Sequence, residues 1–119
     1  MAERVNPCDG KHGAHERLTR VFALLGKRWT GMVLFSLMEG PVHFSELRRS
    51  IPGISERMLS DRLTELGEAG LVVREVVEGP PLGVRYRLTA EGSALEPSMA
   101  ELGRWAERCL KVDQEAAAE

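Results

Sequence analysis

The side chains near the N-terminus that are best suited to chemistry are Cys8, His12 and His15. A cysteine reacts as its thiolate, which the neighbouring cation of Lys11 favours and the carboxylate of Asp9 opposes. The same three side chains are of types that bind zinc, but a structural zinc site takes four ligands and only three are in view here. We therefore expect no bound metal and no cofactor, and Cys8 is either a reactive thiol or an inert one.

A second set of polar side chains lies on one face of a helix predicted to follow Ser55. At 100° per residue, Leu59, Leu63 and Leu66 fall on one side and anchor this helix to a core. Arginine can bond the O6/N7 edge of guanine and hydroxyls can serve bases or phosphates, so the opposite side suits the major groove of DNA. Any amphipathic surface helix has a similar pattern, and a carboxylate repels phosphate unless it accepts from cytosine or pairs with arginine. The set is Arg57, Ser60, Asp61 and Thr64.

Two further arginines alternate with apolar residues in a later segment. Val84, Tyr86 and Leu88 have the spacing of one strand face, with Arg85 and Arg87 between them. If the apolar set faces the core, both arginines point outward, where they can bind backbone phosphate or enter the minor groove. A solvated hairpin with ordinary surface arginines is the alternative. All candidate DNA-contacting residues together are Arg49, Ser55, Arg57, Ser60, Asp61, Arg62, Thr64, Arg85 and Arg87.

The elements that must position these side chains are a helix, a turn, a second helix and a hairpin. Apolar spacing predicts a helix over residues 44–50, Pro52-Gly53 signals a turn, and Ser55 is a good N-cap for a helix that reaches about residue 69. Strands are expected over residues 72–77 and 84–88. This order predicts a winged helix-turn-helix, with the helix-turn-helix at residues 44–69 and the wing at residues 72–88.

Three more helices are expected around this unit. They are predicted over about residues 16–25, 28–38 and 90–111. We expect Thr89 to cap the last of them and Pro97 to kink it, because proline removes one helical hydrogen bond.

The last helix also carries a narrow apolar stripe, which we interpret as a dimer interface shared with the first helix. Packing within one chain is the alternative. Cys109 on this stripe is expected to be a small, buried apolar residue. The candidate interface residues are Leu18, Phe22, Leu95, Met99, Leu102, Trp105 and Cys109.

The length of 119 residues fits a single domain, mainly α with a small β-hairpin. We expect a flexible arm at residues 1–14, a winged-helix domain with N- and C-terminal dimerisation helices at residues 15–111, and an acidic tail at residues 112–119. No apolar run approaches the ~18 residues of a membrane span and the N-terminus lacks a signal-peptide pattern, which predicts a cytoplasmic protein without membrane contact.

Charge and motif content narrow the function further. The net charge of −2 does not favour nucleic-acid binding, so only the placement of charge can support it. No nucleophile has a base at a recognisable spacing and no glycine-rich phosphate loop follows a strand, so we expect no enzyme.

Six short motifs follow one another along nearly the whole chain. They are Gly26-Lys27-Arg28-Trp29-Thr30, Phe44-Ser45-Glu46-Leu47, Pro52-Gly53-Ile54-Ser55, Leu59-Ser60-Asp61-Arg62-Leu63, Gly70-Leu71-Val72 and Tyr86-Arg87-Leu88-Thr89. In these motifs the chain resembles the HxlR-type bacterial transcriptional regulators. The resemblance implies a homodimer of MarR-like architecture that presents two recognition helices to successive major grooves of double-stranded DNA, and hence a pseudo-palindromic operator.

Several members of that family resemble thiol switches that sense oxidants or electrophiles. Cys8 lies where their N-terminal cysteine is expected, followed here by Asp9-Gly10 in place of a proline and a hydrophobic residue. The resemblance thus implies redox sensing through Cys8, and it leaves open a pairing with Cys109 of a second subunit and an unidentified small-molecule effector. The alternative function is a winged-helix protein-interaction module that does not bind DNA.

Overall fold

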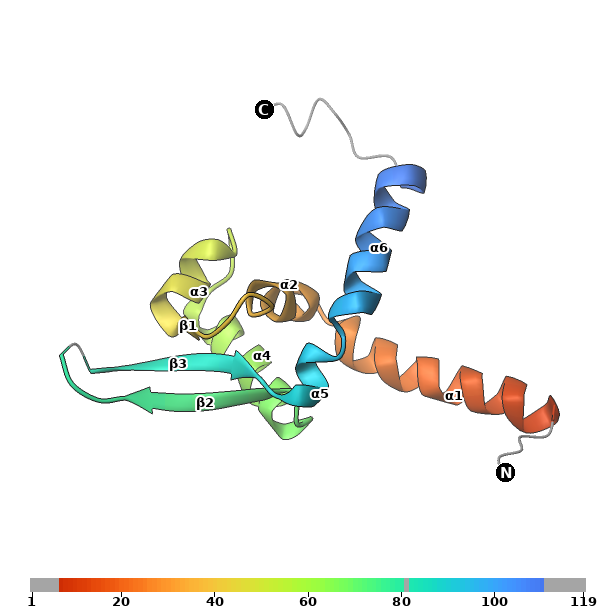
Figure 1. The fold of residues 1–119 in the computed structure, drawn as a ribbon, viewed down its shortest axis with the longest axis horizontal. Coiled ribbons are helices and arrows are strands. Elements are labelled where there is room, and N and C mark those ends of the chain that lie inside the picture. The colour runs from red at the N-terminus through yellow and green to blue at the C-terminus, as the bar shows by residue number, and fades with distance from the viewer. Residues whose placement is uncertain (1–6, 81, 111–119) are drawn as a thin grey trace.

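The computed structural model describes residues 7–80 and 82–110, with side chains from Gly13 onward. Helices and one two-residue strand come first along the chain, and a long hairpin and two C-terminal helices follow (Figure 1). In chain order the elements are α1 (Pro7–Leu25), α2 (Thr30–Ser36), β1 (Val42–His43), α3 (Phe44–Ser50), α4 (Glu56–Glu68), β2 (Val72–Val77), β3 (Gly83–Leu88), α5 (Ala90–Ser93) and α6 (Glu96–Cys109).

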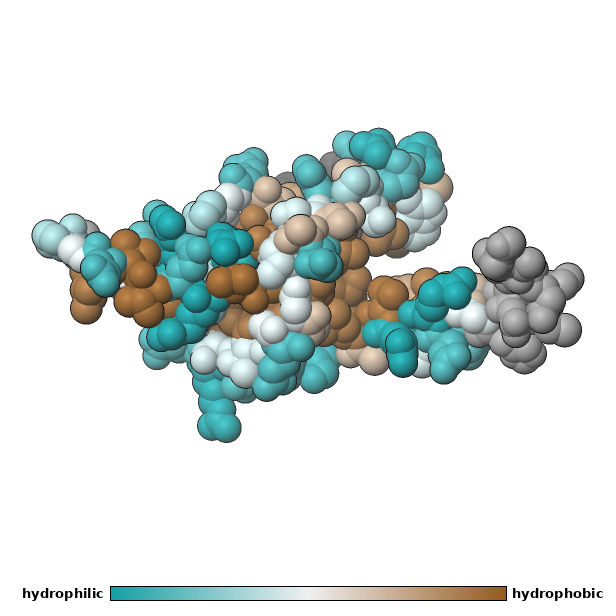
Figure 2. Space-filling model, turned by 60° about the horizontal axis from the view of Figure 1, so that its bottom comes forward, coloured by the Kyte–Doolittle hydropathy of each residue, from teal (hydrophilic) through white to brown (hydrophobic). Residues whose placement is uncertain are grey.

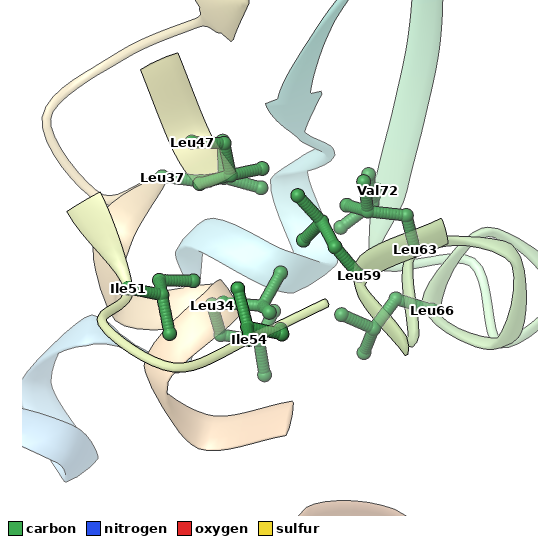
Figure 3. Close-up of a cluster of buried hydrophobic side chains, with 10 residues drawn as sticks. Leu34, Leu37, Leu47, Ile51, Ile54, Leu59, Leu63, Leu66 and Val72 are labelled. Atoms are coloured by element: carbon green, nitrogen blue, oxygen red, sulfur yellow. The ribbon is translucent and has the colours of Figure 1, made fainter. Parts of the chain in front are cut away.

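The core forms where α2, α3 and α4 meet the base of the hairpin (Figure 3). Each helix contributes aliphatic residues at helical spacing, and nearly all of them are fully removed from solvent. Burial of this one cluster fixes α4 against the rest of the domain. The cluster consists of Val33, Leu34, Leu37, Leu47, Ile51, Ile54, Leu59, Leu63, Leu66 and Val72.

The helix-turn-helix unit agrees closely with its sequence prediction. α3 has the predicted bounds, and the Oγ of Ser55 accepts a hydrogen bond from the Met58 amide at 3.0 Å, which caps α4 as expected. Gly53 in the turn has a φ of 89°, a left-handed conformation that glycine adopts without strain. The turn therefore sets the angle at which α4 leaves α3.

The hairpin forms a three-stranded antiparallel sheet with a strand that the sequence did not indicate. β3 pairs with β2 over its whole length, and its other edge pairs with the two-residue β1 through Val42 and His43. A strand this short gives no alternation to detect in a sequence. β1 ties the base of the hairpin to the start of α3, so the hairpin and the helix-turn-helix form one unit.

Both ends of the chain differ from the expected boundaries. α1 begins at Pro7, so residues 7–14 are helical rather than a loose arm, because proline fits the first turn of a helix and Gly10 and Gly13 are tolerated there. Residues 1–6 and the predicted acidic tail lie outside the described residues.

The single C-terminal helix predicted over residues 90–111 is in fact two helices. Thr89 caps the short α5 by accepting from the Gly92 amide at 3.1 Å, and the chain bends at Ala94–Leu95 before α6 begins. Pro97 stands in the first turn of α6, where its missing N–H removes no helical hydrogen bond. The prediction of a kink at Pro97 is therefore wrong in detail: the helix breaks between α5 and α6, just before this proline.

α1 and α6 project away from the body in different directions (Figure 1). The Cα radius of gyration is 17.3 Å, against about 13–14 Å for a compact chain of this length. No residue of α6 is buried. In the described residues, no helix has the length and apolar character that crossing a membrane requires.

Candidate nucleic-acid interface

α4 presents a polar face to solvent on the side opposite its buried leucines. The side chain of Arg57 is 92% exposed, and its Nε lies 4.0 Å from an Asp61 oxygen one turn later. Ser60 and Thr64 are also exposed, so the structure brings together on one face the four residues predicted for recognition. The Arg57–Asp61 pair is solvent-exposed and therefore weak, which leaves the guanidinium available to another acceptor.

The flanking candidates occupy different positions around α4. The hydroxyl oxygen of Ser55 accepts the capping hydrogen bond and so holds the helix N-terminus, and its O–H is still able to donate. Arg49 is exposed at the end of α3 and, with Arg48, lines a shallow hollow that reaches Glu56. Arg48 was not among the residues predicted from the sequence, although it is the immediate neighbour of Arg49.

Arg62, one of the candidate DNA-contacting residues, makes its hydrogen bonds within the chain. Its Nε donates to the Arg28 carbonyl at 3.0 Å, and a terminal nitrogen donates to Glu65 at 2.8 Å. Its side chain is only 14% exposed. Arg62 points inward from α4 because the residues before α2 supply acceptors there, and it therefore holds α4 in place.

Glu65 is the centre of this link between α4 and the segment before α2. One of its oxygens accepts from Arg62, and the other accepts from Lys27 at 3.1 Å. The hydrogen bond from Lys27, together with that from Arg62, lowers the pKa of Glu65 below its usual value of 4.5. The carboxylate is thus charged at neutral pH and connects the end of α1 to α4.

Trp29 adds a packing contact to the same link. Its φ of 83° is rare for a bulky residue, and the Arg28 guanidinium lies 4.6 Å from the centre of its ring. The ring also reaches the turn before α4, since a Cβ placed on Gly53 would lie 3.5 Å from it. The Gly26–Thr30 motif is therefore a brace for the helix-turn-helix rather than part of its exposed face.

The hairpin arginines face away from the core, as the alternation predicts, but both bind one carboxylate. Arg85 donates to Glu75 Oε1 at 2.9 Å, and Arg87 donates to Glu75 Oε2. These hydrogen bonds, that from Arg87 foremost, lower the pKa of Glu75 below 4.5. The trio keeps one net positive charge at neutral pH, which is less than two free arginines would give.

Arg74 is a cation near α4 that was not among the residues predicted from the sequence. It lies on the opposite face of β2 from Glu75, pairs in register with Tyr86, and lines a hollow together with Thr64 of α4. The signal was present in the sequence, because Arg74 is two residues from the buried Val72 and so shares its strand face.

The candidate dimer residues divide into two groups. Leu95 and Met99 pack against the core of their own chain, so for these two the intrachain alternative holds. Leu18, Phe22, Leu102 and Trp105 are exposed. Cys109 is exposed as well, which corrects the expectation of a buried residue; it stands in the last turn of a helix that projects from the body.

The proposed thiol site is only partly visible. Cys8 falls within α1, but its side chain and that of His12 lie outside the described side chains, whereas His15 is exposed. In the part of the chain whose side chains are described, no cluster of three metal-ligating residues is present. The interface described above therefore does not include a thiol or metal site at Cys8.

Comparison with known proteins agrees with this architecture. The family model described as HxlR-like helix-turn-helix matches residues 24–114. The transcriptional regulator YodB of Bacillus subtilis is 41% identical over 92 residues, which cover 77% of this chain and 82% of YodB. Its reduced form superimposes with a TM-score of 0.72, covering 82% of this chain and 96% of that one.

Two further solved structures have the same fold. The oxidised form of the redox regulator HypR is 34% identical with a TM-score of 0.73, covering 81% of this chain and 99% of HypR. A transcriptional regulator of the MarR family from Enterococcus faecalis is 29% identical with a TM-score of 0.74, over 99% and 98% of the two chains. The chain has the helix-turn-helix and the hairpin wing, and it matches the family model and these relatives. It therefore belongs to the HxlR-like helix-turn-helix family of transcriptional regulators.

Proposed function

We propose that two copies of this regulator bind double-stranded operator DNA, with α4 of each copy in the major groove. The observation that carries this proposal is the polar face of α4, where the exposed Arg57 stands beside Ser60 and Asp61 on a helix fixed by three buried leucines. A rigidly held helix presents its side chains to base edges without a further cost of ordering the backbone. Arg57 then reads guanine, and Asp61 orients it or accepts from cytosine.

A titration of labelled DNA from upstream of the regulator's own gene tests this proposal. We expect selective binding that weakens steeply with salt, because phosphate contacts release counterions. Arg57→Ala should reduce the preference for operator over random DNA, whereas Arg85→Ala should weaken both equally. Equal loss on both DNAs from the Arg57 change would remove that residue from base recognition.

The protein-interaction alternative predicts a different outcome. A winged-helix module without DNA binding would leave both DNAs unbound even at low salt, and it would instead recover a protein partner. The neutralised hairpin trio and Asp61 are the features that favour this alternative. The exposed and weakly paired Arg57 favours DNA.

We propose that the exposed apolar surfaces of α1 and α6 form the dimer interface. Phe22 is 64% and Leu102 62% exposed, next to Leu18 and Trp105. Hydrophobic side chains continue from the body onto the base of α1 (Figure 2). A groove of about 640 Å³ between α2 and α6 extends this surface, with Phe35 and Met32 among its lining residues. Large apolar side chains that are exposed together are a common feature of protein–protein interfaces.

We propose further that Cys8 makes the regulator sensitive to oxidants or electrophiles. Its relative YodB has solved structures in quinone-bound and diamide-treated forms, and HypR has a reduced and an oxidised form. Cys8 lies on α1, whose end connects to α4 through Lys27 and Glu65, so a change at α1 has a physical route to the recognition helix.

Operator binding by the wild type and Cys8→Ser, each with and without diamide or a quinone, tests this role. We expect the treatment to change the affinity of the wild type alone. Cys109→Ser removes the exposed thiol at the other end of the chain. A response like that of the wild type would mean that Cys8 acts without Cys109, and a lost response would mean that the two thiols pair. Identical responses of the wild type and Cys8→Ser would dispose of Cys8 as the sensor.

A further inference from the structure

A small hollow lies between the recognition helix and the hairpin. It has a volume of about 140 Å³ and opens to solvent beside the polar face of α4. Its apolar floor is closed by Leu63 and Val72, which belong to the core. Polar side chains from both elements surround this floor: Thr64 from α4, Arg74 from β2 and Tyr86 from β3. A hollow of this size holds several waters at about 30 Å³ each, and so also an anionic group.

Arg74 is the cation of this hollow, and it differs from three other arginines near the interface. Arg62 is bound to Glu65, and both Arg85 and Arg87 are bound to Glu75. Among the described side chains, those of residues 13–80 and 82–110, Arg74 takes part in no ion pair. Its exposed guanidinium is therefore able to bind an external anion with all of its donors.

The sequence of the hairpin tip offers no cation, so a cation on the strands is more important for binding phosphate. The segment from Glu78 to Gly83 contains no lysine or arginine and carries one carboxylate. A wing normally contacts phosphate through cations, and this tip supplies none. A phosphate contact from a cation of the β2–β3 hairpin must therefore come from the strands themselves.

We propose that a backbone phosphate of the DNA binds in this hollow, with the Arg74 guanidinium as its cation and the Thr64 hydroxyl as a second donor. This contact rests on the function proposed above and fixes the depth and register of α4 in the groove. It assigns Thr64 to the backbone rather than to a base. Because phosphate is the same at every step, the contact adds affinity without sequence preference.

Arg74→Met tests the contact on operator and random duplexes over a range of salt concentrations. We expect both affinities of the dimer to fall by roughly a hundredfold, about tenfold for each of the two lost charge-assisted contacts. The slope of log affinity against log salt should decrease by about 1.8 per dimer, since each lost phosphate contact contributes about 0.9. Arg74→Lys should retain the slope, and Thr64→Val should weaken both complexes more mildly. Arg104→Met, which removes an exposed arginine of α6, is the matched control and should change neither value.

Three results would overturn the phosphate contact. They are unchanged binding by Arg74→Met, a loss confined to the operator, and an unchanged salt slope. An operator-only loss would mean that Arg74 reads a base. A thermal melt of each variant verifies that it is folded, as expected for exposed positions. Failure of the wild type itself to bind any duplex at low salt would instead overturn the proposed function, so the two failures are distinguishable.

Discussion

Glu65 and Glu75 each bind two cationic side chains, Glu65 behind α4 and Glu75 on the hairpin. Glu65 joins Lys27 and Arg62, and its partners belong to the brace behind α4. Glu75 joins the two arginines of β3 on the outer face of the hairpin. The same chemistry thus has two consequences: the first pair of contacts fixes a helix, and the second limits the positive charge that the hairpin offers to DNA.

The link at Glu65 predicts a pH-dependent contribution to stability. The pKa of this carboxyl is lowered in the folded chain, so its contribution is present above its ordinary pKa of 4.5 and is lost as the pH falls through the folded value. Glu65→Gln should therefore lower the urea midpoint at pH 7, and the difference from wild type should shrink at pH 3. An equal difference at both pH values would contradict an ionic role for Glu65.

Glu75→Gln should strengthen DNA binding. The lowered pKa keeps Glu75 charged at neutral pH, where it neutralises one of two arginines. The change releases both cations, so affinity for operator and random DNA should rise together, with a steeper salt dependence. Glu78→Gln alters the net charge equally at the hairpin tip and leaves the trio intact, so it should have a smaller effect. A loss of affinity with Glu75→Gln would mean that the carboxylate positions the arginines for DNA.

At the scale of elements, helices and strands with strong periodicity were predictable, and breaks decided by tertiary contacts were not. α3, β2 and the Ser55 cap follow from apolar spacing and capping chemistry. The bend between α5 and α6 does not, because it depends on Gly92 fitting against another part of the chain. The inward turn of Arg62 was likewise invisible, since its acceptor is the Arg28 carbonyl 34 residues earlier.

Gly92 provides a test of how the C-terminal helices attach to the domain. It is buried, and a Cβ there would lie 2.3 Å from the Leu71 carbonyl oxygen, in the turn after α4. Gly92→Ala should therefore destabilise the fold by about 1–3 kcal/mol in urea unfolding, the usual cost of overpacking. Gly103→Ala, on α6 with open space around it, should be neutral or stabilising. A Gly92→Ala variant as stable as wild type would show that α5 is not held against this turn.

In the whole molecule, a single chain leaves large apolar side chains exposed on two helices. Its body is closed around a single core, but α1 and α6 extend from it with large apolar residues exposed (Figures 1 and 2). The apolar stripe of α6 was recognisable in the sequence. The division of that stripe, with Leu95 and Met99 turned to the core and Leu102 and Trp105 turned to solvent, requires the three-dimensional path of the chain.

Dimerisation through this surface can be tested by placing a charge on it. Phe22→Glu and Leu102→Glu should each shift the protein toward monomer in sedimentation at equal concentration, because a carboxylate would be buried without a partner. Leu82→Glu is the control, since Leu82 is 75% exposed at the distant hairpin tip. Dimers of unchanged stability in both interface variants would place the interface elsewhere.

Two copies of the chain should present α4 to successive major grooves, and a hydroxyl-radical footprint of the wild type on its operator measures this. The expected result is two protected regions related by two-fold symmetry, with centres about one helical turn, or a multiple of 10–10.5 base pairs, apart. A single protected region, or protection spread evenly along any duplex, would contradict it.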